Sequence, residues 1–583
     1  MKKIYFILLI GNLLFVKANA QEPQLKWAKS FNGTGTSFDS TSLMKISHVD
    51  NSIYIAGTSD AYSTANDMVL IKRDYATGDT LWTRHYDGPA NSDDEVADMV
   101  IDQTTGDIYI TGKSRGIGTG YDVVTLKYSS SGALSWIRRY DNDLYHRDDI
   151  PKSIGIDKNR NVFISAYTFN GNDSPYYSAY DDALVLKYDY TGNLTGEHCF
   201  NVGDDRTTGL GLGYNKTFDF VEAAKVSNNG EIFVCGECVY GALYHGISWV
   251  FVAGLNPTSN MDDYYSYACA SRGAIGTKTL RFPFAKISRP DDYNFFNAMD
   301  LDSSNNVYLA TLIDTIYSTG TYYNMVISKI DKSGCLDWQQ KTGGDVNYRN
   351  LRVNAIKVDP NNANVYATGY EKNSSGDFDW FVIKYNSSGD FQWRVTKNGN
   401  GNGNDMAYDI AFDDFQNPVV VGRTRNAGGN DDITFIKYDK TNGGEMLSVN
   451  YDSGNGDDRA YHIVVDANQN IIINGLQNTT SQSQNLITLM YSTSTGIDEN
   501  VINSGISVYP NPTSDVLRVS VNKKFDSDFT VKVYDNAGVL LQTSRKSESL
   551  TSFDMDLSNY PNGVYTLRIE ASGFYYQSKV IKK

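Results

Sequence analysis

Paired acidic residues recur along this 583-residue chain, each pair or single Asp lying just before a short apolar run of β type. Carboxylate oxygens suit Ca²⁺, a hard cation that takes six to eight oxygen ligands. If the runs surround one axis, these carboxylates predict a calcium site at its mouth. An Asp at a strand entrance also accepts backbone N–H bonds from its own turn or the next repeat, and repetition favours this structural role. The candidates are Asp93, Asp94, Asp148, Asp149, Asp291, Asp292, Asp405, Asp457 and Asp458.

Tyrosines form the second set of candidate binding residues. The chain contains 42 of them, and eight fall in connections of three consecutive repeats where the chain is longest. A tyrosine ring offers a flat apolar face with a polar tip, which suits sugar rings or protein partners. Packing of long loops onto the body of the fold is the structural alternative. The eight are Tyr176, Tyr177, Tyr180, Tyr240, Tyr244, Tyr317, Tyr322 and Tyr323.

Other reactive groups form no known catalytic arrangement. The six histidines are scattered without metal-ligand spacing, and the sequence has no GxSxG, HExxH or phosphate loop. Cys235 and Cys238 form a CGEC pair at the end of a predicted strand, whereas a redox pair would need a strand-to-helix turn. We expect a structural role for both and, apart from calcium, no cofactor. A catalyst assembled from separate loops stays open.

A repeated unit of four β-type runs positions these residues. In its clearest copy the runs are residues 97–102, 107–112, 122–128 and 133–140, separated by turns rich in Gly, Asn, Asp or Ser. The second run recurs eight times, and successive tryptophans of the fourth run, such as Trp82 and Trp136, lie 54 or 55 residues apart. Four-stranded repeats of this size predict an all-β propeller of about eight blades, with seven as the alternative count.

The two ends of the repeat region have complementary defects. Residues 25–33 (LKWAKSFNG) form a Trp-bearing fourth run with no first three runs before it. The last repeat stops at Tyr491 and lacks a Trp-bearing fourth run. We therefore expect the N-terminal run to complete the eighth blade and to cover a sheet edge that would otherwise be open.

Connection lengths distinguish the two faces of the predicted ring. In an up-and-down meander the first-to-second and third-to-fourth turns share one face. These turns are tight, as in residues 103–107 (QTTGD) and 129–133 (SSSGA). The other connections are long and variable, most of all in the third to fifth repeats, so we expect the long-loop face to carry function.

The remaining segments indicate export. Residues 1–20 have two lysines, an apolar run and Ala18-Asn19-Ala20, the pattern of a signal peptide cut before Gln21. The apolar run is too short to span a bilayer, and we expect no transmembrane segment after cleavage. The net charge of −16 makes nucleic acid a poor partner. Beyond the propeller (21–491) we expect a polar linker (492–505) and a small β-sandwich (506–583).

The C-terminal segment is similar to the type A sorting domain of the type IX secretion system of Gram-negative bacteria. The similarity rests on YPNPTSDVLRVSV, VKVYDNAGVLL, LSNYPNGVYTLRIEASG and the final KVIKK, in this order. It implies recognition by the type IX machinery, passage through the periplasm and outer membrane, and release or surface attachment. The repeats resemble, more loosely, a bacterial β-propeller repeat family through DMAYDIAFDDFQNPVVVG and DRAYHIVVDANQNIIING. That resemblance implies no single activity.

Three functional hypotheses follow. The favoured one is a secreted or cell-surface propeller that binds polysaccharide or a surface protein on its long-loop face without catalysis. The second is a secreted polysaccharide-active enzyme with its site on the same face. The third is a surface scaffold or adhesin component whose propeller spaces other parts.

Overall fold

The computed structural model describes residues 23–32, 39–59, 65–142, 145–169, 181–200, 217–227, 231–240, 247–255, 264–266, 280–282, 296–317, 320–332, 336–342, 351–478, 484–492, 506–521, 528–535, 540–571 and 574–583. The described residues form strands and turns and contain no helix. The chain divides into two compact units, one spanning Glu22–Thr493 and the other containing Ser494–Lys583.

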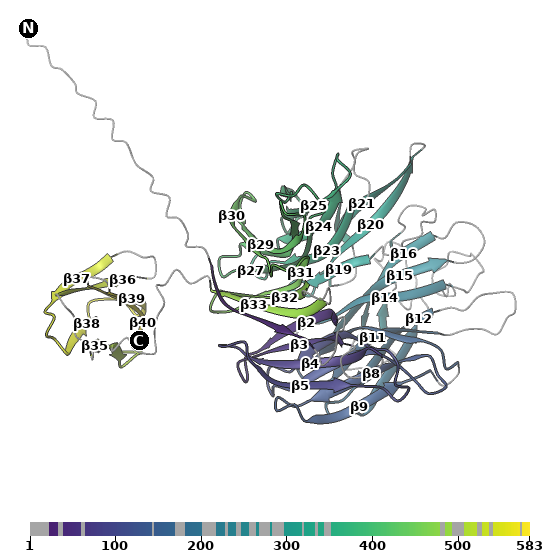
Figure 1. The fold of residues 1–583 in the computed structure, drawn as a ribbon, viewed down its shortest axis with the longest axis horizontal. Helices are drawn as coiled ribbons and strands as arrows, with labels where there is room; N and C mark the ends of the chain where they lie inside the picture. Colours follow the sequence, from purple (N-terminus) through teal and green to yellow (C-terminus); the bar gives the residue numbers. More distant parts are fainter. Residues whose placement is uncertain are drawn as a thin grey trace, which may run out of the picture. The chain divides into compact units, whose positions relative to one another are not determined.

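The first unit is built from eight antiparallel sheets (Figure 1). The first four blades are β2 (Asp39–Ser47), β3 (Ser52–Ser59), β4 (Asp67–Asp74), β5 (Thr80–Tyr86); β6 (Asp94–Ile101), β7 (Ile108–Arg115), β8 (Tyr121–Tyr128), β9 (Leu134–Tyr140); β10 (Asp149–Ile156), β11 (Val162–Phe169), β12 (Asp181–Tyr188), β13 (Leu194–Phe200); and β14 (Thr217–Val226), β15 (Ile232–Tyr240), β16 (Ile247–Leu255), β17 (Tyr264–Ser266), with β18 (Leu280–Phe282) also on β16.

The last four blades continue the same order. They are β19 (Phe296–Leu301), β20 (Val307–Tyr317), β21 (Gly320–Ile330), β22 (Leu336–Thr342); β23 (Leu351–Val358), β24 (Val365–Lys372), β25 (Phe378–Tyr385), β26 (Phe391–Lys397); β27 (Met406–Phe412), β28 (Pro418–Arg425), β29 (Asp431–Tyr438), β30 (Glu445–Tyr451); and β31 (Asp458–Val465), β32 (Asn470–Asn478), β33 (Gln484–Ser492), joined by β1 (Gln24–Phe31).

The blades form a closed ring of eight. The first strand of each blade contacts the first strand of the next, from β2 through β6, β10, β14, β19, β23 and β27 to β31, which contacts β2. The middle strands are buried on both faces, as in β3, where every residue is buried. Sheets that stack face to face bury consecutive rather than alternate residues, which explains the continuous apolar runs. The expected β-propeller is confirmed.

The N-terminal strand completes the eighth blade. β1 pairs antiparallel with β33, from Gln24 opposite Ser492 to Phe31 opposite Leu486. Trp27 is 8% exposed and belongs to one core with residues of the first and eighth blades, including Ile53 and Ile472. The N-terminal strand, which we predicted to complete the last repeat, therefore covers the edge of β33.

A repeated contact on the short-turn face joins neighbouring blades. Trp82 Nε1 and Lys72 Nζ both donate to Ser130 O, at 3.3 and 2.8 Å, in the third-to-fourth turn of the next blade. Tyr54 packs edge-on against the Trp82 ring, with 5.8 Å between centroids. Gly132 (φ +81°) lies on that ring, where an added Cβ would be 3.0 Å from the indole. We call this arrangement the interblade clasp.

The clasp recurs around the ring. The indole N–H donates to the next turn from Trp136 to Tyr190 O (3.3 Å), from Trp338 to Ser387 O (3.0 Å) and from Trp393 to Lys440 O (3.1 Å). The Trp27 ring also lies against Gly78 of the first blade, but its indole N–H makes no hydrogen bond with any described residue. The regular tryptophan spacing therefore reflects contacts between blades as well as the period of the repeat.

Two blades differ from the expected pattern. In the fourth, the outer strand is divided, because β17 and β18 pair with different ends of β16. β18 comes from an insertion that we expected to be a loop. In the fifth, β20 and β21 pair along their whole length up to Tyr317 opposite Gly320. The long connection in which we expected Tyr317, Tyr322 and Tyr323 is therefore wrong, because all three lie on the paired strands of a hairpin.

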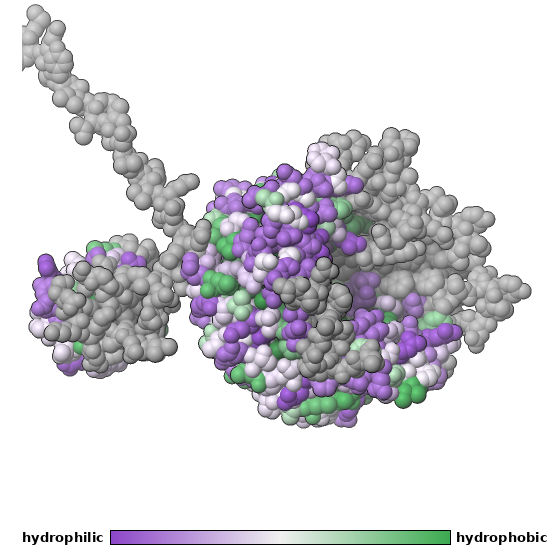
Figure 2. Space-filling model, viewed as in Figure 1, coloured by the Kyte–Doolittle hydropathy of each residue, from purple (hydrophilic) through white to green (hydrophobic). Residues whose placement is uncertain are grey.

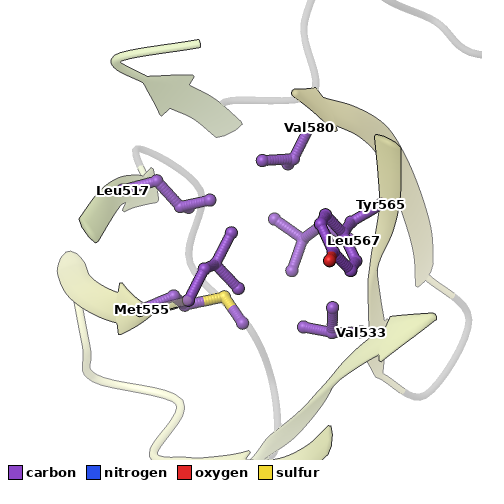
Figure 3. Close-up of a pocket in the computed structure, with 7 residues that line it drawn as sticks. Leu517, Val533, Met555, Tyr565, Leu567 and Val580 are labelled. Carbon is purple, nitrogen blue, oxygen red and sulfur yellow. The ribbon is translucent and has the colours of Figure 1, made fainter. Parts of the chain in front are cut away.

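The second unit contains two sheets. One is β34 (Ile506–Tyr509), β35 (Val516–Val521) and β38 (Ser552–Asp556); the other is β37 (Leu540–Lys546), β36 (Phe529–Tyr534), β39 (Gly563–Ala571) and β40 (Phe574–Lys582). Figure 3 shows the apolar side chains between them, including Leu517, Met555, Leu567 and Val580. All four are at most 5% exposed, so this space is the packed core of a small sandwich.

Candidate functional site

The long-loop face carries the connections that differ most between blades. Its second-to-third connections differ in length. The shortest, between β20 and β21, is residues 318–319, and the longest, between β11 and β12, is residues 170–180. Most turns on the other face are short, such as 129–133 and 189–193. Figure 2 shows hydrophilic residues over most of the described surface on the side in view. The contrast between faces agrees with the expectation that the long-loop face can vary independently of the core.

The candidate carboxylate nearest to each described inner strand is buried and hydrogen-bonded. Asp94, Asp149, Asp405 and Asp458 all have zero exposure and begin, or immediately precede, an inner strand. Each accepts a backbone N–H from the loop just before that strand. The donors are Gly88 N to Asp94, Asn142 N to Asp149 (2.9 Å), Gly399 N to Asp405 (2.7 Å) and Ser453 N to Asp458 (2.6 Å).

The preceding residue ties the loop to the previous blade. Its side-chain oxygen accepts the backbone N–H at the start of that blade's third strand. The pairs are Asn66 N to Asp93 (3.1 Å), Tyr121 N to Asp148 (2.9 Å), Phe378 N to Asn404 (3.0 Å) and Asp431 N to Asp457 (2.9 Å). This is the geometry expected of the structural role. Asp291 and Asp292 lie outside the described residues.

Burial raises the pKa of several of these carboxyls. For Asp149, burial is the largest cause and brings the pKa to about 7, opposed by hydrogen bonds from Thr168 Oγ1 and Asn142 N and reinforced by Asp141. Burial likewise raises the pKa of Asp405 to about 6. Both side chains have no exposed surface, and their hydrogen bonds go to neighbouring parts of the fold.

One group of carboxylates approaches the arrangement of a metal site. Oxygens of Asp67, Asp87 and Asp94 lie within 4.8 Å of one another. These three residues could hold a hard cation such as Ca²⁺, which prefers oxygen ligands. Of these three residues, only Asp94 was predicted as a candidate metal ligand from the sequence. The repeated Asp at the start of third strands, as in Asp67, Asp122 and Asp182, is the signal that could have indicated the second position.

The candidate tyrosines are only partly placed. Tyr240 ends β15, Tyr317 ends β20, and Tyr322 and Tyr323 lie on β21, opposite Thr315 and Asp314. These four therefore belong to strands near the long-loop face. Tyr176, Tyr177, Tyr180 and Tyr244 lie outside the described residues, so their grouping with the other four stays a prediction.

The two cysteines of the CGEC pair lie within β15. Cys235 is a free thiol with no exposure, and burial raises its pKa well above the ordinary value. Cys235 Sγ lies 3.4 Å from Met299 Sδ in the core between the fourth and fifth blades. A buried, protonated thiol is a poor nucleophile, which favours the structural role.

The C-terminal unit has a buried lysine at its penultimate position. Lys582 is 6% exposed, and its Nζ donates to the carbonyl oxygens of Leu557, Ser558 and Tyr560 at 2.8, 3.0 and 2.7 Å. Lys583 N donates to Thr513 O at 2.9 Å, so the last strand is also held by the NPTSD segment. The first and last sequence motifs that resemble sorting domains, which contain NPTSD and KVIKK, therefore contact each other in the fold.

Comparison with protein families decides the role of this unit. Residues 507–583 match the family described as "Secretion system C-terminal sorting domain". Residues 507–583 are a sorting domain. The protein is therefore exported by type IX secretion to the cell surface or the medium. In the described parts of the chain, no helix has the length and apolarity that crossing a membrane requires.

Comparison with solved structures gives only distant similarity. The quinohemoprotein alcohol dehydrogenase ADHIIG from Pseudomonas putida HK5 has 9% identity and a TM-score of 0.43, over 85% of this chain and 80% of that one. A protein of unknown function from Bacteroides caccae has 9% identity and a TM-score of 0.26, over 56% and 90%. A eukaryotic initiation factor has 8% identity and a TM-score of 0.34, over 70% and 87%. No curated protein matches the sequence significantly.

Proposed function

We propose that the sorting domain delivers a non-catalytic binding or adhesion module, whose propeller binds polysaccharide or a surface protein through its long-loop face. The observation that carries the proposal is the difference between the two faces. The short-turn face is occupied by interblade clasps, in which tryptophan and lysine donors bond to the next blade. The described connections before inner strands are held at that strand by the buried carboxylates, and loops on a rigid scaffold can vary without disturbing the blades.

The buried carboxylates also favour binding over catalysis. A general acid or base must come within hydrogen-bonding reach of the substrate. Asp94, Asp149, Asp405 and Asp458 have raised pKa values because of burial, but none has exposed surface. Their charge state serves the fold, so these four carboxylates are poor candidates for a catalytic acid or base.

A glycan array with a chain lacking residues 501–583 tests the proposal. We expect binding to at least one polysaccharide class, and loss of that binding when residues 170–180 are replaced by the five-residue connection 426–430. The matched control replaces the short turn 129–133 with residues 386–390 and should bind normally. Absence of binding to both glycans and isolated cell-surface proteins would contradict the proposal, as would equal loss in the control.

A polysaccharide-active enzyme is the second candidate, and one described carboxyl favours it. Asp181 begins β12, is partly exposed, and has a pKa raised to about 6, first by burial and then by Asp182 and Asp148. A carboxyl with such a pKa suits a general acid in glycoside hydrolysis. New reducing ends released from a bound glycan, and lost in D181N, would replace the binding-only proposal with this one.

A further inference from the structure

Exposed asparagines followed by glycine gather in the last three blades. Among the propeller residues that the structure describes, five Asn-Gly pairs have an exposed asparagine. Three lie in the connection between β26 and β27, one in the connection between β30 and β31, and one in the turn between β29 and β30. In the same order, the asparagines are Asn398, Asn400, Asn402, Asn455 and Asn442.

An Asn-Gly pair can modify itself. The backbone nitrogen of the glycine attacks the side-chain carbonyl carbon of the asparagine, and the missing Cβ of glycine allows the close approach. A bond forms between this nitrogen, which gives up its proton to the solvent, and asparagine Cγ. The Cγ–Nδ2 bond breaks and ammonia leaves. Water then opens the cyclic imide to aspartate or isoaspartate, so the reaction consumes only water.

Hydrogen bonds protect two of the three pairs between β26 and β27. Gly399 N donates to Asp405 Oδ2 at 2.7 Å, and Gly401 N donates to Arg425 O at 2.9 Å. Each bond directs the N–H away from the preceding side chain, and the loop must open locally before the nitrogen can attack. The asparagines that precede these two glycines are therefore held in an unreactive arrangement.

The pair on the short-turn face is protected from both sides. Gly443 N donates to Asp439 O at 2.8 Å, and the turn is one of those that receive a tryptophan ring. The side chain of Asn442 is also engaged, because its Oδ1 accepts Gly444 N at 2.7 Å. Both reacting groups of this pair are thus occupied in the folded protein.

The remaining two pairs lack this protection. Gly403 N and Gly456 N form no hydrogen bond with any residue that the structure describes. The side chain of Asn402 likewise has no hydrogen bond within the described parts of the chain, whereas Asn455 Nδ2 donates to Ser453 O at 3.2 Å. Asn402 is therefore free to bring its side-chain carbonyl carbon to the next nitrogen, and Asn455 must first break one bond.

The two unprotected pairs occupy equivalent places on neighbouring blades. Each is followed at once by the two residues that anchor the connection. Asn404 and Asp457 accept a backbone N–H of the previous blade, and Asp405 and Asp458 are the buried carboxylates. Isoaspartate lengthens the backbone just before these anchors, so its formation displaces them.

We propose that Asn402 and Asn455 are sites of spontaneous deamidation in the folded protein, with Asn402 the faster of the two. The other three exposed pairs keep their asparagines because the fold holds the attacking nitrogen. Deamidation adds a negative charge to the end of a long-loop connection and, as isoaspartate, loosens its anchor. This inference goes beyond the function proposed for the long-loop face and does not depend on it.

Peptide mapping by mass spectrometry, after incubation of the full chain in mildly alkaline buffer, tests the proposal. Each deamidation raises the peptide mass by about 1 Da. Asn402 should react at least about fivefold faster than Asn400, a ratio that corresponds to about 1 kcal/mol of protection. Both asparagines have glycine on either side, so sequence does not explain a difference. The matched control is the same incubation in urea, where the two rates should be similar.

The variant D405A tests the cause of protection. It removes the acceptor of Gly399 N, so Asn398 should deamidate about fivefold faster than in the parent. Asn442 lies on the other face and should stay protected, which shows that the blade is still folded. Equal rates at Asn400 and Asn402 in the folded chain would overturn the proposal, as would intact Asn402 when the urea sample reacts. An unchanged rate at Asn398 in folded D405A would overturn the hydrogen-bond explanation.

Discussion

At the scale of single residues, Asp149 shows how burial converts a carboxyl into a pH-dependent part of the fold. Its side chain has no exposed surface, and its pKa rises from 3.8 to about 7. The folded state therefore favours the protonated form. The resulting stability is fully present below the unfolded pKa and is lost as the pH rises through about 7.

The first prediction is that D149N removes part of this pH dependence. The wild-type propeller should lose stability between pH 5 and pH 8, with a contribution from Asp149 on the order of 3 kcal/mol. An asparagine stays neutral, so the fall in melting temperature between the two pH values should be smaller in the variant. Thermal unfolding at both pH values measures it. An identical fall in both proteins would show that Asp149 is not the group responsible.

Lys582 has a structural role that its neighbour lacks. Its ammonium group is the shared donor for three carbonyl oxygens, of which Leu557 O also accepts Tyr560 N. The second prediction is that K582M destabilises the sorting domain by about 2–4 kcal/mol, because buried acceptors lose a charged donor. The exposed neighbour provides the control K583M, expected within about 0.5 kcal/mol of the parent. Urea unfolding of the sorting domain transition in the full chain compares them, and equal stability would contradict the assignment.

At the scale of elements, the clasp depends on glycines that receive a tryptophan ring. Gly443 has φ +73°, and an added Cβ would lie 2.7 Å from Trp393 Cε3. Gly429 in the same blade has φ +89° with nothing within 4 Å of an added Cβ. Both positions share the backbone strain of a left-handed conformation, and only Gly443 adds a clash.

The third prediction uses this pair. G429A should cost about 1–2 kcal/mol of stability from backbone strain alone. G443A should cost about 1–3 kcal/mol more, since overpacking forces the indole away from the turn. Equilibrium unfolding in denaturant measures both variants. Equal costs would mean that the clasp does not hold the blades together.

The sequence predicted elements well where a pattern is local and repeated. The apolar runs around Tyr109 and Val124 and the defect at Trp27 led directly to blades and closure. The loop expected around Tyr322 and Tyr323 was wrong, although β-branched and aromatic residues there favour a strand. β38 was missed, although its alternation of buried Phe553 and Met555 with Asp was a usable signal.

Sites that depend on contact between blades were harder to predict. Asp67 and Asp94 are 27 residues apart and meet because each begins a strand, β4 or β6, at the junction between the first two blades. Sequence spacing alone does not contain this contact.

At the scale of the whole molecule, the propeller closes without help from the C-terminal unit. Its ring of inner strands returns to β2, and its last edge is covered by β1. The fourth prediction is that removing residues 501–583 leaves the propeller's melting temperature within about 2 °C of the parent. The truncated protein should stay in the periplasm. Cell fractionation with thermal unfolding checks both, and normal surface delivery would contradict the role of the sorting domain.

Closure by the N-terminal strand is the central structural claim, and the melting temperature of a chain lacking residues 21–33 tests it most directly. Loss of β1 leaves β33 with an open edge and removes the Trp27 contact with Gly78. We predict a decrease of several degrees, because an open sheet edge and the lost core contacts of Trp27 destabilise the ring. W27A in the intact chain should show part of the same decrease. A melting curve identical to the parent would contradict the account.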